Sequence, residues 1–414
     1  MESENMRRRI EDEIEHTIAS PVIKNKRFLE DEQLIKSEQL AVLEEIFNTN
    51  VRDMEITKLS KHFTPIFRND HPYHIAVWGK TGTGKTLTLT YFLNLLLRLG
   101  AERNIQIRYK HLDLSTPVPC FRALNDLACL LNAMKRYQRG ISLDEMMIAI
   151  EAKLADYPGY LILFIDEVDN IRRDKDTFMA FLIRRLPQKI PAKLILVFAS
   201  NHLDWPDHLD PRVKSFLKMN EIIFKPYDAV DLQHILRIRV EKALCQEAIE
   251  PGVIEKIAAL ASYDHGDARK AVALLAKSAH LAEQRRTKVK LGLVDEAAKE
   301  LDMDRYSAML KSAPKQLQAA MASVIEATKL QSNKRIGTAD AYDAYRKFCK
   351  KARVSQLSGR AFGDLIGELD LYSFIRSRMI SRGRYGRARE IILELPEELL
   401  KKIYGMILLK FQLR

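Results

Sequence analysis

One eight-residue segment, Gly79 to Thr86 (Gly-Lys-Thr-Gly-Thr-Gly-Lys-Thr), constrains the fold more than any other part of this sequence. Its spacing, G-x-x-x-x-G-K-T, is typical of a loop whose backbone N–H groups surround a phosphate. In such a loop Lys85 reaches the phosphate oxygens and the Thr86 hydroxyl is a ligand for Mg²⁺. The apolar run 74–78 before the loop predicts a buried strand, and residues 87–99 after it have a helical pattern. A chance glycine-rich turn is the alternative, but the flanking strand and helix favour a nucleoside triphosphate site. The residues expected at the nucleotide are Gly79, Lys80, Thr81, Gly82, Thr83, Gly84, Lys85 and Thr86.

Apolar strands alternate with amphipathic helices over residues 74–225, which predicts a parallel sheet with right-handed crossovers. Residues 228–303 have an all-helical pattern, and Asp302 to Pro314 is interpreted as a linker or junction. Beyond it we expect three helices and then a β-hairpin over residues 376–395, because two apolar/polar stretches flank a Gly-Arg-Tyr-Gly turn. The strands of the parallel sheet are expected near residues 74–78, 105–112, 160–165, 193–199 and 221–224.

Polar side chains follow two of the expected strands. Asp166 and Glu167 end a fully apolar strand, where a pair of carboxylates is costly unless it has a function. Beside a phosphate loop, Asp166 would bind Mg²⁺ through water and Glu167 would activate the attacking water as a general base. Asn201 follows the strand near 193–199 and would orient water or the γ-phosphate; an asparagine that caps the next turn is the alternative.

Two arginines are further candidates for the nucleotide. Arg212 precedes an expected helix and could act as an arginine finger on a neighbouring subunit's nucleotide, with a surface ion pair as the alternative. Arg269 follows Asp267 at the start of another expected helix, where a positive charge is unfavourable to the helix dipole. We therefore expect Arg269 to have an anionic partner, and a γ-phosphate beneath a helical lid would supply it.

The positive charge of the chain is concentrated near its C-terminal end. The net charge of the 414 residues is +12, and residues 311–414 carry 21 Lys+Arg against 10 Asp+Glu. This distribution is typical of a polyanion-binding module attached to a nearly neutral remainder. A basic surface that serves solubility is the alternative.

Length and composition restrict the class of protein. A chain of 414 residues with 47% hydrophobic and 29% charged residues predicts a soluble protein of two or three domains. No apolar run is long enough to span a bilayer, and the charged N-terminus leads into no apolar secretory segment. The four cysteines and ten histidines lack the spacing of metal ligands, so we expect free thiols in a reducing compartment and no structural metal.

Residues 355–395 predict a DNA-binding element. Ser358 would cap a helix over residues 360–369 that fits a major groove, and Gly359, Gly363 and Gly367 would give this helix one bare face. The following hairpin has six arginines and no acidic residue within fourteen residues, and glycines flank the arginine and tyrosine at its tip. Such a tip suits a narrow minor groove, whereas a solvated ribbon is the alternative. The residues expected to contact DNA here are Ser358, Arg360, Arg382, Arg384, Tyr385 and Arg387.

Taken together, these motifs resemble those of the AAA+ ATPases, and more narrowly of the archaeal replication initiators, which are relatives of the eukaryotic origin recognition complex and cell division control proteins. The similar segments are 78–86, 209–215, 266–271 and, in the hairpin, 381–390. The resemblance implies an α/β fold with a P-loop, a three-layer parallel-sheet core, a helical lid and a C-terminal winged helix-turn-helix domain. It assigns Asp166 and Glu167 to the Walker B pair, Asn201 to sensor one, Arg212 to the box seven arginine and Arg269 to sensor two.

The resemblance also implies an organisation and a function. The expected domains are an AAA+ base with an N-terminal helical extension over 1–225, a lid over 226–305 and a winged-helix domain over 306–414. The implied cofactors are ATP or ADP with Mg²⁺. The resemblance also implies that ATP is hydrolysed slowly and that its hydrolysis acts as a switch. The implied partners are double-stranded origin DNA, the replicative helicase and other initiator subunits, in the cytoplasm at the nucleoid and away from any membrane. A branch-migration motor and an ATP-binding transcription regulator remain alternatives.

Two further segments are compared with the family. Its DNA-contacting insertion follows the second strand, where this chain has residues 115–119 leading into 120–131. Thr116 or Arg122 would touch phosphate there, and an ordinary surface helix start is the alternative. Near 35–40 the family often has His-Arg-Glu at an adenine contact, whereas this chain has Ile-Lys-Ser-Glu-Gln-Leu.

Overall fold

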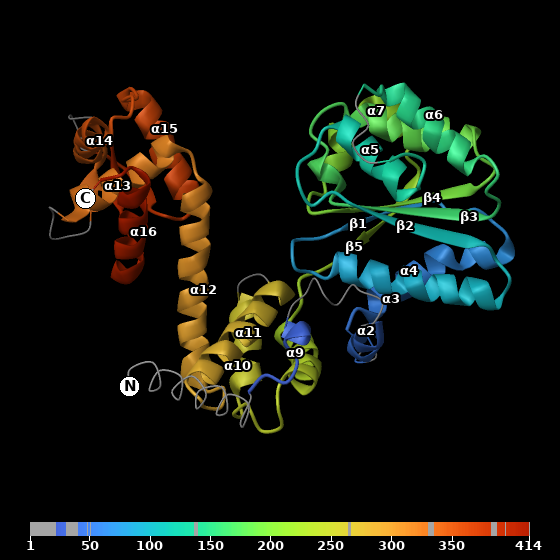
Figure 1. Ribbon diagram of the computed structural model, residues 1–414, viewed down its shortest axis with the longest axis horizontal. Helices are drawn as coiled ribbons and strands as arrows, with labels where there is room; N and C mark the ends of the chain where they lie inside the picture. The colour runs from blue at the N-terminus through green and yellow to red at the C-terminus, as the bar shows by residue number, and fades with distance from the viewer. Residues whose placement is uncertain are drawn as a thin grey trace, which may run out of the picture. The chain divides into compact units, whose positions relative to one another are not determined.

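The chain divides into two compact units, Met1–Asp295 and Glu296–Arg414, in the computed structural model (Figure 1). The residues that the structure describes are 22–29, 40–47, 49, 51–135, 140–263, 266–329, 335–381, 387–393 and 395–413. The segment 35–39, compared above with an adenine contact, lies outside them. Among the described residues, no helix is both long and apolar enough to cross a membrane.

The first unit contains a parallel sheet, as predicted. Its described strands follow the order β2-β3-β4-β1-β5. Because β1 pairs with β4 on one side and with β5 on the other, the carboxyl ends of the central strands meet at one edge, which is where α/β sheets bind ligands. The strands are β1 (His74–Trp78), β2 (Ile107–Asp113), β3 (Tyr160–Asp166), β4 (Lys193–Ser200) and β5 (Met219–Ile223).

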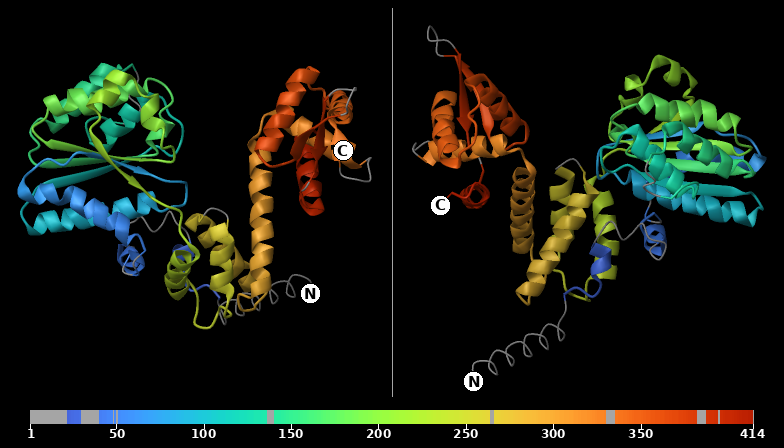
Figure 2. Two further views of the ribbon diagram at one scale, coloured as in Figure 1. Left: turned by 180° about the vertical axis from the view of Figure 1, so that it is seen from behind. Right: turned by 45° about the horizontal axis from the view of Figure 1, so that its top comes forward.

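Helices cover both faces of this sheet (Figures 1 and 2). Helices α5 (Cys120–Leu130), α6 (Leu143–Leu154) and α7 (Lys175–Ala180) lie on one face, and α3 (Asp53–Phe63) and α4 (Lys85–Glu102) lie on the other. The sequence of β3 explains the three layers. Leu161, Leu163 and Ile165 point into the hydrophobic core shared with α5, α6 and α7. The alternate residues Tyr160, Ile162 and Phe164 point into the core shared with α3 and α4.

Shorter elements connect these layers. A single-turn helix, η5 (Val168–Asn170), follows β3 directly, and α8 (Pro211–Phe216) precedes β5. Other short elements of the first unit, outside the lid helices, are α2 (Leu40–Phe47), η4 (Thr64–Arg68), η6 (Phe181–Arg185), η7 (Leu186–Gln188) and η8 (Trp205–His208).

After β5 the chain forms a helical subdomain within the first unit. Its helices are α9 (Ala229–Ala243), α10 (Val253–Tyr263), α11 (Ala268–Gln284) and the start of α12 (Leu291–Ser312). Helix α9 begins with a capping box between Asp228 and Asp231. The N-terminal element η1 (Lys26–Leu29) packs on α9 and α11, so the beginning of the described chain is part of this subdomain.

The second unit combines helices with a small antiparallel sheet of described order β6-β8-β7. The predicted hairpin is present as β7 (Arg376–Ser381) and β8 (Arg387–Ile392), and β8 also pairs with β6 (Arg335–Gly337), which the sequence analysis missed. The aromatic side chains Tyr345, Phe348, Phe362 and Phe374 are buried in its core. The helices are α13 (Lys315–Lys329), α14 (Thr338–Ala352), α15 (Gly359–Leu371) and α16 (Glu397–Lys410).

The predicted linker from Asp302 to Pro314 is wrong. Helix α12 runs unbroken to Ser312, because neither glycine nor proline occurs between Gly292 and Pro314 to end it. Only Ala313 and Pro314 separate α12 from α13.

Candidate nucleotide site and nucleic-acid interface

The glycine-rich loop connects β1 to α4 at the carboxyl edge of the sheet. Gly82 and Gly84 both have φ of +77°, a left-handed conformation that glycine adopts without strain. Space also requires glycine: a Cβ at Gly82 would lie 1.8 Å from Asp267 Oδ1, and one at Gly84 would lie 2.1 Å from Tyr227 Oη. The loop is therefore enclosed by residues of the helical subdomain and of the segment that leads into it.

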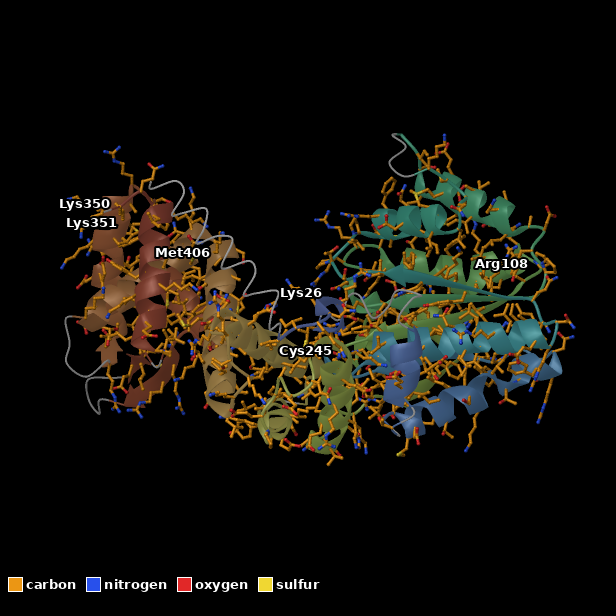
Figure 3. The ribbon with its side chains drawn as sticks, turned by 60° about the horizontal axis from the view of Figure 1, so that its bottom comes forward. Lys26, Arg108, Cys245, Lys350, Lys351 and Met406 are labelled. Atoms are coloured by element: carbon orange, nitrogen blue, oxygen red, sulfur yellow. The ribbon has the colours of Figure 1, made fainter. Side chains whose placement is uncertain are left out.

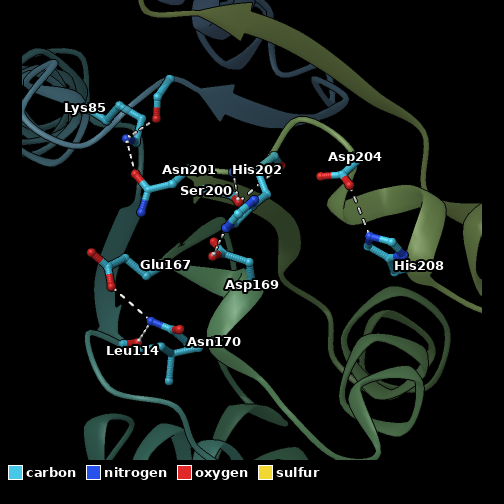
Figure 4. A network of polar contacts seen from close by, with 11 residues as sticks. Lys85, Leu114, Glu167, Asp169, Asn170, Ser200, Asn201, His202, Asp204 and His208 are labelled. Carbon is cyan, nitrogen blue, oxygen red and sulfur yellow. Dashed lines mark hydrogen bonds and ion pairs between the residues drawn. The ribbon is translucent and has the colours of Figure 1, made fainter. Parts of the chain in front are cut away.

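Lys85, the first residue of α4, is buried and directed back into this loop. Its Nζ donates hydrogen bonds to Gly79 O at 2.6 Å, Lys80 O at 3.0 Å and Asn201 Oδ1 at 2.9 Å (Figure 4). Burial lowers the pKa of Lys85, and the nearby Asp166 carboxylate opposes this shift. The structure thus brings Lys85 together with Asn201, 116 residues later in the chain.

The carboxylates of Asp166, the last residue of β3, and Glu167, the next residue, lie near the same loop. Thr86 Oγ1 donates a hydrogen bond to Asp166 Oδ2 at 2.6 Å, and Asp166 Oδ1 accepts one from the Glu167 N–H at 3.0 Å. Hydroxyl and carboxylate oxygens are the ligands that Mg²⁺ prefers, so this pair fits the predicted metal position. Asn170 Nδ2 donates to Glu167 Oε2 at 3.0 Å. Burial, with the charges of Asp166 and Asp169, raises the pKa of Glu167.

These groups line a cavity of about 830 Å³. The loop from Thr81 to Thr86 lines it together with Asp166, Glu167 and Asn201. The helical subdomain contributes Ile235, Arg239 and Arg269, and α2 contributes Ile46 and Phe47. Asp267 caps α11 by accepting hydrogen bonds from the N–H groups of Arg269 and Lys270, which places Arg269 at the cavity.

Arg212 does not line this cavity. It is exposed and lies inside the first turn of α8 rather than before the helix, because Asp210 is the N-cap residue and Pro211 is the first helical residue.

Family comparison gives a consistent result along the chain. Residues 68–204 match the family model of the AAA domain, residues 233–299 that of the Cdc6 AAA+ ATPase-type lid domain, and residues 308–403 that of the CDC6, C terminal winged helix domain. The ORC1-type DNA replication protein of Pyrococcus furiosus is 31% identical over 364 residues, covering 85% of this chain and 85% of that protein. The chain belongs to the ORC1-type family of DNA replication proteins. ORC1-type DNA replication protein 1 of Archaeoglobus fulgidus is also 31% identical, over 355 residues and 85% of each chain.

A solved ORC1-type structure agrees with this assignment. The Aeropyrum pernix ORC1 protein, determined in complex with DNA, superimposes with a TM-score of 0.75 at 25% identity, covering 93% of this chain and 97% of that one. The predicted fold class is therefore confirmed, including the lid and the winged-helix domain. Membership of an AAA+ family also supports the predicted nucleotide binding.

The sequence analysis missed Arg52 at the nucleotide loop of this ORC1-type chain. Arg52 is buried, has φ of +70° and donates from Nη2 to Thr83 O and to Lys225 O, both at 2.7 Å. Its guanidinium lies 3.9 Å from the centroid of the Tyr227 ring. It therefore connects the segment before α3 to both the loop and the start of the lid. Its partners are up to 173 residues away in sequence, and no local pattern indicates them.

His111 on β2 is a second residue that the motifs did not indicate. Its ring stacks on Phe164 at 4.4 Å, and its Nε2 lies 3.6 Å from Asp166 Oδ2. The register of the sheet accounts for the stacking, because His111 and Phe164 are aligned partners on β2 and β3; Asp113 and Asp166 are aligned at the ends of the same strands. Asp113 lines the cavity as well.

The structure describes part of the expected DNA-binding set of the second unit. Ser358 caps α15 through the Ala361 N–H, as predicted, and Arg360 is exposed in the first turn of that helix. Arg382, Arg384 and Tyr385 lie outside the described residues, as does the side chain of Arg387 in β8. Exposed Lys350 and Lys351, in the last turn of α14, add to the basic groups of this unit (Figure 3).

Residues 115–119, where the DNA-contacting insertion is expected, form an exposed turn that is held at a buried residue. Thr116 is exposed, whereas Val118 is buried and pairs with Ile171. Arg122 lies in the first turn of α5, and its Nε is 3.8 Å from Asp126 Oδ2. Both proposed contact residues are thus accessible on the same short segment.

Proposed function

We propose that this chain is an ATP-dependent DNA replication initiator that binds origin DNA and helps to load the replicative helicase. The observation that carries the proposal is the combination of two parts in one chain. A cavity lined by Lys85, Thr86, Asp166 and Glu167 supports nucleotide binding, and a strongly basic Cdc6-type winged-helix domain supports DNA binding.

In the proposed nucleotide site, each residue would have a separate role. Lys85 and the loop N–H groups would hold the phosphates, and Glu167 would accept the proton of the attacking water. Thr86 and Asp166 would hold Mg²⁺, which neutralises the charge on the phosphates when bound. Asn201 would orient the γ-phosphate or the water, because its amide already contacts Lys85 Nζ.

Arg269 supplies the link between nucleotide state and shape. It lies on the lid side of the cavity, so a γ-phosphate that attracts it would favour a closed lid. Arg212 is exposed outside the cavity of its own chain, which favours a role at the nucleotide of another initiator subunit. Slow hydrolysis suits such a switch, since the closed form must persist while partners assemble.

On the DNA side, helix α15 and the basic hairpin would hold the duplex, assisted by Thr116 and Arg122 of the first unit. Phosphate contacts give affinity, and a hairpin tip in the minor groove gives positioning. Such a protein acts at the nucleoid.

The test is a genome-wide map of where the protein binds in its own cells, read beside a map of where replication starts. We expect a few discrete sites that coincide with replication starts. Occupancy at promoters without replication starts would instead indicate a transcription regulator, and occupancy without discrete sites would indicate a branch-migration motor. Either result contradicts the proposal.

A matched variant separates a working ATP switch from a vestigial one. Glu167→Gln removes the proposed base but keeps the side-chain shape, so we expect the ATP-bound form to accumulate and replication starts to change in number or timing. Unchanged replication in cells that carry only this variant would contradict the switch.

A further inference from the structure

Two segments of the first unit are joined edge to edge by hydrogen bonds. One is the acidic turn, residues 166–173, which contains the two strand-end carboxylates; the other is the DNA-side segment, residues 114–120. Backbone hydrogen bonds join the two segments at both ends and in the middle. These are Leu114 N to Asp166 O at 3.2 Å, Val118 N to Asn170 O at 3.0 Å, Arg172 N to Val118 O at 2.9 Å and Cys120 N to Arg173 O at 3.1 Å.

Asn170 joins these two segments through its side chain as well. Its Nδ2 donates to Glu167 Oε2 at 3.0 Å and to Leu114 O at 2.9 Å (Figure 4). A primary amide has two N–H donors. Asn170 therefore uses one donor for the Glu167 carboxylate and the other for the Leu114 carbonyl of the DNA-side segment. The backbone carbonyl of Asn170 accepts the Val118 bond at the same time.

This geometry couples two places that differ in exposure. Glu167 lines the nucleotide cavity, whereas Thr116 and Pro117 are exposed on the DNA-side segment and do not line it; Ser115, which precedes them, lines the cavity as well. Because Leu114 is buried and bonded to Asn170, a displacement of the exposed turn that reaches Leu114 would change the geometry of the amide that holds Glu167. The same amide transmits a movement of Glu167 in the other direction.

We propose that Asn170 is a positioning residue that couples the Glu167 carboxylate to the DNA-side segment, so that bound nucleotide and bound duplex affect each other through it. The inference rests on the proposed function, since it requires duplex DNA at residues 115–119. Coupling between two binding sites is reciprocal in free energy. The affinity for duplex should therefore depend on the nucleotide, and this dependence should require Asn170.

The experiment measures the duplex Kd of the full chain loaded with ADP or with a non-hydrolysable ATP analogue. For the wild type we expect the two Kd values to differ by about 5-fold or more, the lower end of typical coupling. For Asn170→Ala the difference should fall below about 2-fold while the affinity of the ADP form stays near that of the wild type. Asn94→Ala is the matched control, because Asn94 is equally half-buried and donates a similar amide bond to Thr90 O at 2.8 Å.

A second variant guards against loss of folding. Asn170→Asp keeps the shape but removes both donors and places a negative charge beside Glu167, so it should lose the nucleotide dependence as the alanine variant does. Hydrolysis measured with and without duplex gives a parallel readout, and its response to DNA should also be lost in both Asn170 variants.

Each outcome bears on one of the two proposals. A nucleotide dependence that survives in both Asn170 variants overturns the coupling role, as does a wild type that binds duplex equally in both nucleotide states. A wild type that binds no duplex overturns the proposed function itself. A loss of the dependence in Asn94→Ala as well would show general damage to the domain and would equally contradict a specific role for Asn170.

Discussion

Glu167 combines three unfavourable conditions in a single residue. It has φ of +52°, although only glycine adopts this left-handed region freely, and such backbone strain costs about 1–3 kcal/mol. Its carboxylate is half-buried, and it lies near the negative charges of Asp166 and Asp169. Strain and repulsion of this kind persist where a residue has a functional task, which supports the assignment of Glu167 as the base.

The pKa of Glu167 gives a prediction about pH. A general base must be deprotonated, so a raised pKa places the acidic limit of hydrolysis above the ordinary glutamate range. Asp169→Asn removes one of the charges that raise this pKa, and we expect the acidic limb of the pH–rate profile to move to lower pH. Single-turnover hydrolysis at a series of pH values measures it. Asp156→Asn, an exposed carboxylate on the same domain, is the control, and an unmoved limb in Asp169→Asn would contradict the assignment.

At the scale of elements, local sequence patterns predicted the strands and the helix cap that interactions between neighbouring residues determine. The five strands of the parallel sheet were found from apolar runs, and the α15 cap from Ser358, because these signals lie within a few neighbouring residues. Helix α12 was cut short because a polar stretch was taken for a linker, although polar residues without glycine or proline continue a helix.

Contacts between residues that are far apart in the sequence could not be predicted, because no pattern of neighbouring residues indicates them. Asn170 and Leu114 are 56 residues apart, and the bond between them exists only because β2 and β3 are paired in register. Arg52 and β6 likewise depend on partners brought together by the whole fold. The sequence therefore indicated groups that line the cavity, such as Lys85, Asp166 and Glu167, but not the groups that hold them in place.

The glycines of α15 give a prediction at this scale. A Cβ at Gly363 would meet nothing within 4 Å, yet its carbonyl accepts a 3.0 Å bond from Arg389 Nη1 on β8. Gly363→Ala should stabilise the helix by about 0.5–1 kcal/mol because alanine has the higher helix propensity. If this bare face approaches DNA closely, the same variant will bind duplex more weakly despite its higher Tm. Denaturant unfolding and duplex titration test the two effects, and a gain in stability with unchanged affinity would place DNA away from this face.

At the scale of the whole molecule, the charge is unevenly divided. Residues 311–414 carry a net charge of +11 out of +12, so the winged-helix part is basic while the remainder is almost neutral. Binding to a polyanion releases counterions in proportion to the phosphates that are neutralised. The dependence of duplex affinity on salt therefore reports on the second unit more than on the first.

This division predicts how single arginines affect DNA binding. Arg384→Ala removes a cation from the hairpin, and we expect weaker binding to all duplexes together with a salt slope (log K against log salt) that is smaller in magnitude by about 1. Arg68→Ala removes an exposed arginine from the first unit, so its slope should match that of the wild type. Titrations of one duplex at several salt concentrations supply the slopes. If the Arg384 variant keeps both its affinity and its slope, then the hairpin does not contact phosphate, and the basic charge of this unit must act through α14 and α15 instead.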